Sequence, residues 1–251
     1  MNYYMKVLDR SPQFWRFWEE RCRVNRAFVP EYSEYYLGKF EIDAYDSHSL
    51  HVGIFQQEEG QEKELGFARI TYNTANDPVV ENRLPNEIAK VVEEVYPDPS
   101  VSPLPLWENY HLSEQALNAF PFYQGGIQMK TAEIGRLMIL EKNSSVRLAT
   151  HFITYILALT KYLGIDVALA SQTQAHYKFY ARYFAISHAW DPPYKHGDDM
   201  CISVFDLHRR LRNKQDLMDH MIQEFRHKGF SHPIQFESHE LLRSSLLKPQ
   251  H

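Results

Sequence analysis

The chain has 251 residues, of which 44% are hydrophobic and 14% aromatic, enough apolar material to build one sizeable core. Its 27 basic and 32 acidic side chains give a net charge of −5, which argues against a dedicated nucleic-acid-binding protein, because such proteins carry a basic excess. The presence of two cysteines, Cys22 and Cys201, argues against a disulfide framework. The N-terminus lacks the apolar stretch of a signal peptide, and no apolar run is long enough to span a membrane. We therefore expect a cytoplasmic protein without a membrane span and without nucleic acid as a partner.

The first half of the chain predicts a helix, a strand hairpin and a second helix. Ser11 and Pro12 precede apolar residues at helical spacing, and a polar link around Gly60 separates two runs with strand character. Four closely spaced prolines then predict an extended connector. The expected elements are a helix to about residue 28, strands over 50–56 and 65–72, a helix from about residue 85 and a connector over 97–105.

The second half alternates more regularly between strands and helices. Its expected elements are a strand over 131–140, a helix over 144–164, a strand over 166–171, a helix over 174–186, a strand over 200–205 and a basic helix over 206–229. The final stretch is expected to be a poorly ordered tail. Together these elements predict one α/β (α+β) domain over 1–230 and a tail over 231–251, with a central mixed, mostly antiparallel sheet flanked by helices.

The strand–helix–strand unit over 131–171 predicts a binding cleft. A parallel pair of strands that splays apart opens a gap, and the helix after the first strand points its N-terminal amide groups at that gap. A pantetheine arm could lie there with its phosphate at the helix N-terminus. The side chains available to that phosphate are Lys142, Ser144, Ser145 and Arg147. The alternative is that the serines only cap the helix and the two cations are solvated.

Three motifs in a fixed order carry a resemblance to known acyltransferases. They are Asp43-Ala44-Tyr45-Asp46, Gly66-Phe67-Ala68-Arg69 and Glu133-Ile134-Gly135-Arg136-Leu137, preceded by Arg21 in the first helix. Over roughly residues 15–215 this order resembles the acyl-homoserine-lactone synthases, the long-chain N-acyl amino acid synthases and the exosortase-associated acyltransferases. The resemblance implies a GNAT-like fold and an acyltransferase that moves a fatty acyl group from a thioester to an amine. It implies no tightly bound cofactor, and its donor would be acyl carrier protein phosphopantetheine or acyl-CoA.

Departures from the family pattern bear on both substrates. A run without glycine over 141–147 replaces the usual glycine-rich diphosphate loop, so we expect coenzyme A to bind less well and acyl carrier protein to be the donor. Asn25 stands where the lactone synthases have an aromatic residue, and the insertion over 73–130 is long. These differences favour an amino acid or a related amine over S-adenosylmethionine as acceptor. Phe184 occupies a position where the wider GNAT group has glycine.

Glu133 is the candidate general base, and Arg136 is its candidate partner. Amide formation requires the amine to lose a proton, which a nearby carboxylate can accept. Arg136 could orient Glu133 or hold an acceptor carboxylate through two of its nitrogens. Residues three apart project to opposite faces of a regular strand, so both reach one cleft only if a bulge, which Gly135 would permit, intervenes. The alternative is a structural ion pair that ties the sheet to the first helix.

A second candidate group, for substrate binding, alternates basic and acidic residues: Arg21, Asp43, Asp46 and Arg69. The resemblance implies a polar network beneath the acceptor site, in which Asp46 and Arg69 hold the ammonium and the carboxylate of an amino acid. The alternative is that the four residues tie the first helix to the hairpin. Tyr180 stands where many GNAT enzymes have a tyrosine that protonates the departing thiolate, and the alternative for it is packing on the sheet.

A basic patch is expected at the start of the last helix. Its members are Arg209, Arg210, Arg212 and Lys214. Acyl carrier proteins are acidic, so this patch is a candidate docking site, and a solvated helix face is the alternative. The histidines show no ligand spacing, and no metal is expected. Two other functions stay open: a non-catalytic module that binds fatty acyl groups or acyl carrier protein, and an acyl-homoserine-lactone synthase.

Overall fold

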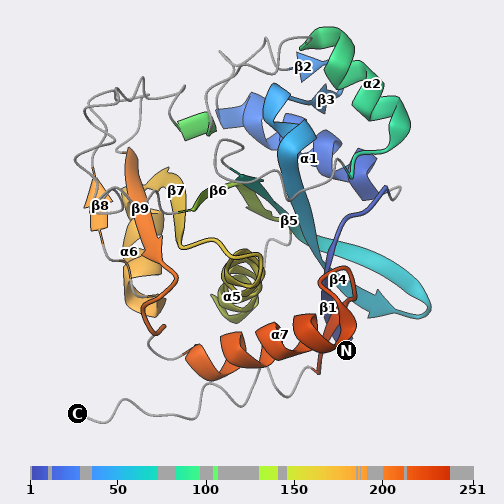
Figure 1. Cartoon of the computed structure of the whole chain (residues 1–251). Helices are drawn as coiled ribbons and strands as arrows, with labels where there is room; N and C mark the ends of the chain where they lie inside the picture. The colour runs from blue at the N-terminus through green and yellow to red at the C-terminus, as the bar shows by residue number, and fades with distance from the viewer. Residues whose placement is uncertain are drawn as a thin grey trace.

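A mixed sheet of eight strands lies at the centre of the computed structural model, with helices on both faces (Figure 1). The structure describes residues 2–10, 13–28, 36–72, 83–96, 104–106, 130–140, 146–184, 186, 188–190, 200–211 and 214–237. In spatial order the strands are β10 (Ile234–Glu237), β1 (Asn2–Val7), β4 (Ser49–Glu58), β5 (Gln61–Tyr72), β6 (Thr131–Ile139), β7 (Val167–Thr173), β9 (Met200–Asp206) and β8 (His188–Trp190). All neighbours are antiparallel except β6 and β7, which confirms the predicted mixed, mostly antiparallel sheet.

The long helices divide between the two faces of the sheet (Figure 1). One face is covered by α1 (Gln13–Phe28) and α2 (Asn86–Val95), and the other by α5 (Val146–Tyr162), α6 (Gln174–Tyr183) and α7 (Gln215–Lys228). The short hairpin of β2 (Tyr36–Leu37) and β3 (Phe40–Glu41) and the 3-10 helix η2 (Ala44–His48) lie between α1 and β4 in the chain. Within the described segments, no helix has both the length and the apolar character that crossing a bilayer requires.

Alternation along the central strands sends apolar and polar side chains to different faces. On β4, Val52 and Ile54 belong to the core beneath α5, whereas His51 lies against the ring of Phe14 in α1, with ring centroids 5.1 Å apart. On β5, Ala68 and Ile70 are in the α5 core and Arg69 points to the α1 side, where it meets η2. The polar residues of the first two motifs are therefore gathered on the α1 face.

The parallel pair of strands separates after only three paired residues. Thr131, Ala132 and Glu133 of β6 pair with Val167, Ala168 and Leu169 of β7. Beyond that point β6 continues beside β5 to Ile139, and β7 continues beside β9 to Thr173. The residues of β6 are buried as far as Ile134 and only half-buried from Gly135 onward. The predicted splayed pair is confirmed, and Glu133 is its last paired residue on β6.

A bulge in β6 lies directly after this point. Arg69 pairs with Gly135 and Phe67 pairs with Met138, so two residues, Arg136 and Leu137, face the single residue between them on β5. The left-handed residue of the bulge is Arg136, with φ 53°, rather than the glycine before it. The inserted residue reverses the alternation of the strand, which brings Arg136 to the same face as Glu133.

The last helix begins later than the sequence predicts. β9 continues to Asp206 and α7 begins at Gln215, so Asp206 does not cap a helix; its carboxylate accepts the His208 N–H at 3.0 Å within a turn. Leu207 and Leu211 are buried in the core beneath α5, and their burial holds the chain in a turn where a helix was expected.

The sheet also extends into the segment that was expected to be a tail. Strand β10 pairs with β1 from Asn2↔Glu237 to Met5↔Ile234. Ile234 and Phe236 are buried in the same core as α5 and α7. A poorly ordered tail from residue 231 is therefore wrong up to Glu237, because two segments from opposite ends of the chain complete each other's hydrogen bonds.

Candidate active site

A network of seven ionisable side chains lies between α1 and the sheet. Its members are Arg21 from α1, Glu41 from β3, Asp43 and Asp46 at η2, His51 from β4, Arg69 from β5 and Arg136 from β6. All of these side chains are at most 5% exposed except that of Arg136, which is 22% exposed. The three motifs and the first helix, far apart in sequence, thus meet at one place.

Asp46 is the centre of this network. Its Oδ1 atom accepts hydrogen bonds from Arg21 Nη1 at 2.8 Å and Arg69 Nη1 at 2.9 Å, and lies 2.9 Å from His51 Nε2. Its Oδ2 atom accepts the Asp43 backbone N–H at 2.9 Å, while an Asp43 side-chain oxygen accepts the Tyr45 N–H at 3.0 Å. The spacing of the two aspartates therefore has a local cause, because together they form a capping box around η2.

Glu41 completes the charge balance and was not a candidate from the sequence. Its Oε1 atom lies 3.2 Å from Arg21 Nη2 and 2.9 Å from Arg136 Nη2. With Asp43 and Asp46 it supplies three carboxylates for three guanidinium groups. No charge imbalance in the three motifs points to Glu41, since with Arg21 they hold three arginines and three acids.

The pKa shifts of Asp43 and Asp46 show that both aspartates of the network are ionised at neutral pH. Burial opposes ionisation of Asp46, but Arg21 and Arg69 outweigh it and hold its pKa well below the usual value. The pKa of Asp43 is lowered in the same way, mainly by Arg69 against burial. Burial lowers the pKa of His51, so its ring is neutral and its Nε2–H donates to the carboxylate of Asp46.

These contacts bear on the predicted substrate-binding group. The structure brings Arg21, Asp43, Asp46 and Arg69 together, as the resemblance implied, but each is buried and already paired within the network. The geometry supports the alternative that they tie α1 to the hairpin of β4 and β5. A direct grip of Asp46 and Arg69 on an acceptor stays a prediction.

Glu133 lies on the same face but outside the ion pairs. The carboxyl is 6% exposed, and its Oε2 atom accepts the Leu106 N–H at 2.8 Å. Among the described residues it forms no salt bridge. Burial raises its pKa to about 7, and the Leu106 N–H and the more distant Arg69 and Arg136 only partly offset that rise. A carboxyl with a pKa near neutrality is suited to act as a general base.

Arg136 connects the network to the half-buried part of β6. Its Nη2 atom lies 2.9 Å from Glu41 and 3.4 Å from Asp43. Arg136 is the most exposed member of the network, and the bulge brings it to the same face of β6 as Glu133. It is therefore the network side chain best placed to meet a substrate carboxylate. Arg136 pairs with Glu41 and Asp43, which supports the alternative of a structural ion pair, and an orienting role of Arg136 toward Glu133 stays a prediction.

Tyr180 lies on the other face of the sheet. It is buried in the core beneath α5 and α6, where its ring contacts Phe184 at 6.3 Å and Phe205 at 5.8 Å between centroids. Burial raises the pKa of its hydroxyl. The placement supports the packing alternative, and proton donation by Tyr180 stays a prediction.

Of the residues expected to bind phosphopantetheine, only Arg147 is within the described part of the chain. It lies in the first turn of α5, and Lys142, Ser144 and Ser145 fall outside the described residues. Burial lowers the pKa of Lys214, and the positive charge of Arg147 contributes to the same shift. Two cations therefore lie near each other at the N-terminal ends of α5 and α7.

The predicted docking patch is not a helix face. Arg209 and Arg210 are exposed in the turn after β9, and Arg212 falls outside the described residues. Arg209 Nε lies 3.3 Å from Asp206 Oδ2, and an Arg210 nitrogen lies 3.8 Å from Asp216 Oδ1. These pairs are exposed, so both arginines remain accessible to an acidic partner.

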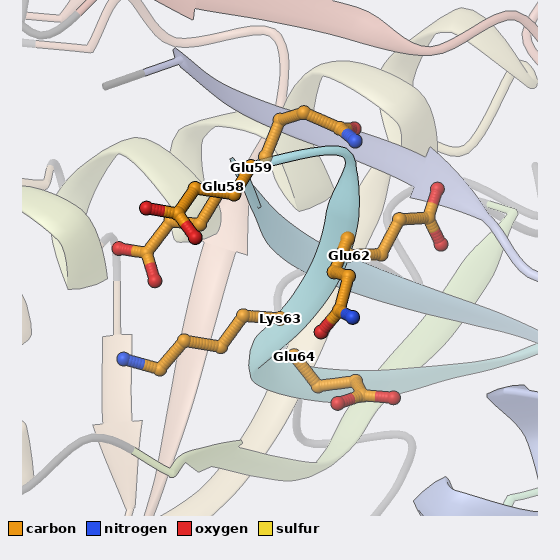
Figure 2. A pocket seen from close by; sticks show the side chains of 7 residues that line it. Glu58, Glu59, Glu62, Lys63 and Glu64 are labelled. Atoms are coloured by element: carbon orange, nitrogen blue, oxygen red, sulfur yellow. The ribbon is translucent and has the colours of Figure 1, made fainter.

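A large open hollow lies elsewhere, at the hairpin that joins β4 and β5 (Figure 2). Its volume is about 880 Å³, and it is lined by Gln57, Glu58, Glu59, Gln61, Glu62, Lys63 and Glu64. Thr71, which pairs with Glu133, is roughly 30 Å along β5 from this hairpin at the usual rise per residue. The hollow is therefore separate from the network. Among the described residues, no group of His, Cys, Asp and Glu side chains could hold a metal ion.

The fold belongs to the class seen in acyl-homoserine lactone synthases. The chain is similar to the CoA-dependent acyl-homoserine lactone synthase BjaI, solved with SAM and isopentyl-CoA, with a TM-score of 0.52 and 10% identity over 97% of this chain and 99% of that chain. It is also similar to the synthase LasI (TM-score 0.49, 14% identity, 85% and 93% covered). A third similar structure is FeeM, an N-acyl amino acid synthase from uncultured soil microbes (TM-score 0.43, 14% identity, 82% and 90% covered). No family model and no curated protein sequence matches the chain. The likeness to BjaI shows a shared fold.

Proposed function

We propose that this chain is an N-acyltransferase that moves a fatty acyl group from a pantetheine thioester directly to an amine. One observation carries the proposal. The parallel strands β6 and β7 separate immediately after Glu133, and the carboxyl of that residue has a pKa of about 7. A thioester arm that enters between the strands would bring its carbonyl carbon close to a base that is half ionised at neutral pH.

The proposed step needs no covalent acyl-enzyme. The amine nitrogen attacks the thioester carbonyl carbon, a C–N bond forms, and the C–S bond breaks. Glu133 accepts the proton that the nitrogen loses, and the departing thiolate takes a proton from solvent or from Glu133. The thiolate is stable enough to leave without a dedicated acid, because the ordinary thiol pKa is about 8.5.

The donor we favour is acyl carrier protein. The run over 141–147 has no glycine to approach a diphosphate, whereas carrier-bound pantetheine presents a single phosphodiester. Positive charge is available at two places. Arg147 and Lys214 lie at the N-terminal ends of α5 and α7, and Arg209 and Arg210 lie in the turn after β9. For the acceptor we favour an amino acid or a related amine, whose carboxylate Arg136 could bind at its exposed edge.

The test is to incubate the purified full chain with medium- and long-chain thioesters of acyl carrier protein and of coenzyme A. Pooled amino acids and, separately, S-adenosylmethionine are offered as acceptors. Thiol release is followed with a chromogenic thiol reagent, and new amides are sought by mass spectrometry. Release that depends on an amino acid and yields its amide would support the proposal.

Two outcomes would favour the rival functions. Binding of the thioester without any thiol release would favour a non-catalytic acyl or carrier-protein module. Release that requires S-adenosylmethionine and yields a lactone would favour an acyl-homoserine-lactone synthase, the activity that the likeness to BjaI in fold makes worth testing.

A further inference from the structure

Gly135 stands apart from the other described glycines because neither its backbone nor its packing against described residues requires a glycine. Its φ is not in the left-handed region, since the bulge places Arg136 there instead. The other six described glycines each have a reason. Four of them have a positive φ: Gly38, Gly60, Gly164 and Gly229. At the other two an added Cβ would clash, lying 2.5 Å from the Phe55 ring at Gly53 and 2.6 Å from the Met138 carbonyl oxygen at Gly66.

Apart from its chain neighbours, one atom of the described residues borders the space that a side chain at position 135 would occupy. Among the described residues, the only heavy atom within 4 Å of an added Cβ is Glu133 Oε1, at 3.5 Å. The other carboxyl oxygen, Oε2, already accepts the Leu106 N–H. Among the described residues Oε1 has no hydrogen-bond partner, so it is available to accept a proton, and it lies beside the space above Gly135.

This space lies where a substrate would arrive. Gly135 is the second residue past the last β6–β7 pair, and it begins the half-buried part of β6. A proton passes from a nitrogen to a carboxylate only when the two atoms are about 3 Å apart. An amine that reached Glu133 Oε1 through this space would overlap a Cβ atom placed 3.5 Å from that oxygen.

We infer that Gly135 leaves open the position of the acceptor amine, and that it thereby limits the size of the group that can approach Glu133. The inference rests on the proposed function, since it assigns the acceptor to one side of the same site. Gly135 is then a specificity-determining residue, because its lack of a side chain leaves room for the acceptor.

The inference can be tested with the Gly135→Ala variant, because this protein should fold as the wild type does. Gly135→Ala meets no backbone strain and, among the described residues other than its chain neighbours, one ordinary van der Waals contact. With the donor and acceptor identified by thiol release, the two Michaelis constants are measured separately. We expect Gly135→Ala to raise the KM for the acceptor at least about tenfold while the KM for the donor stays unchanged, and Gly135→Val to raise it further.

Gly164→Ala is the matched control. Gly164 has φ +81° at the end of α5, so alanine there should lower Tm without changing either KM. If Gly135→Ala leaves the acceptor KM unchanged, or raises the donor KM instead, the inference is overturned although the enzyme is active. If the wild-type chain releases no thiol with any amine, it is the proposed function that fails, so the two failures are distinct.

Discussion

Glu133 and Arg136 project from the same face of β6 although they are three residues apart. The left-handed backbone of Arg136 inserts one extra residue opposite β5 and reverses the alternation of the strand. The two side chains nevertheless have different partners, because Arg136 pairs with Glu41 whereas Glu133 accepts only the Leu106 N–H among the described residues. The bulge thus places a paired cation and an uncompensated carboxyl side by side, and the charge state of that carboxyl is the most testable property of the site.

Replacing Glu133 with glutamine should remove the proposed base and keep the shape of the side chain. We expect Glu133→Gln to lower kcat by about 10²–10⁴-fold, with little change in the KM for the thioester donor. Steady-state thiol release measures both constants. The control is Glu64→Gln in the hairpin far from the site, which should leave both constants unchanged. Activity of Glu133→Gln within a few-fold of wild type would rule out the base role.

The pH dependence of activity follows from the raised pKa of Glu133. The base must be ionised to accept a proton, so the pH profile of kcat/KM should contain a limb with an apparent pKa of about 7, below which the ionisation of Glu133 alone contributes about a tenfold fall per pH unit. The amine acceptor contributes its own ionisation at higher pH. The limb near pH 7 should therefore be absent in Glu133→Gln, while the amine limb remains. If the limb near pH 7 persists in the variant, it belongs to another group.

The same group makes the stability of the fold depend on pH. Burial raises the pKa of Glu133 from 4.5 to about 7, so its contribution to the free energy of unfolding is fully present below about pH 4.5 and is lost as the pH rises through 7. Glu133→Gln does not titrate. Between pH 4.5 and pH 8.5 the stability of the variant relative to wild type should increase by about 3 kcal/mol. Urea unfolding at several pH values measures it, and a difference that is independent of pH would show that the carboxyl is not buried in solution.

Asp46 tests the architectural role of the network. Asp46→Asn leaves Arg21 and Arg69 buried with one anion too few, and removing one partner of a buried ion pair costs about 3–5 kcal/mol. Chemical denaturation measures the loss. Glu224→Gln, which breaks an exposed i,i+4 pair with Lys228 on α7, is the control and should change the midpoint little because solvent screens that pair. An Asp46→Asn variant as stable as wild type, but inactive, would favour acceptor binding by Asp46.

Charge reversal tests the carrier-protein surface. Arg209→Glu combined with Arg210→Glu removes two exposed cations after β9 and should raise the KM for an acyl carrier protein donor, most clearly at low salt. A small acyl-pantetheine donor should keep its KM, because it does not reach the turn. Equal effects on both donors would contradict a docking role.

Much of the fold was readable from local patterns. Helical spacing behind Ser11 and Pro12, strand runs on both sides of Gly60 and the alternation over 131–186 predicted α1, β4, β5, β6, α5, β7 and α6 within a few residues. These elements depend on neighbours within a few positions in the chain, so periodicity is enough to find them. Where distant packing decides the outcome, as for the turn held by Leu207 and Leu211 or the pairing of β10 with β1, the local pattern predicted the wrong element.

The motifs likewise named most of the polar residues that meet between α1 and the sheet, because their types and order are written in the chain. Only the three-dimensional arrangement showed that Glu41 supplies the third carboxylate, that Arg136 rather than Gly135 takes the left-handed position, and that Glu133 stands outside the ion pairs. The physical reason is that a pKa or an ion pair depends on desolvation and on charges brought close by the fold. Residue order specifies which groups exist, and tertiary packing decides which of the described groups neutralise each other and which one is left without an ion-pair partner.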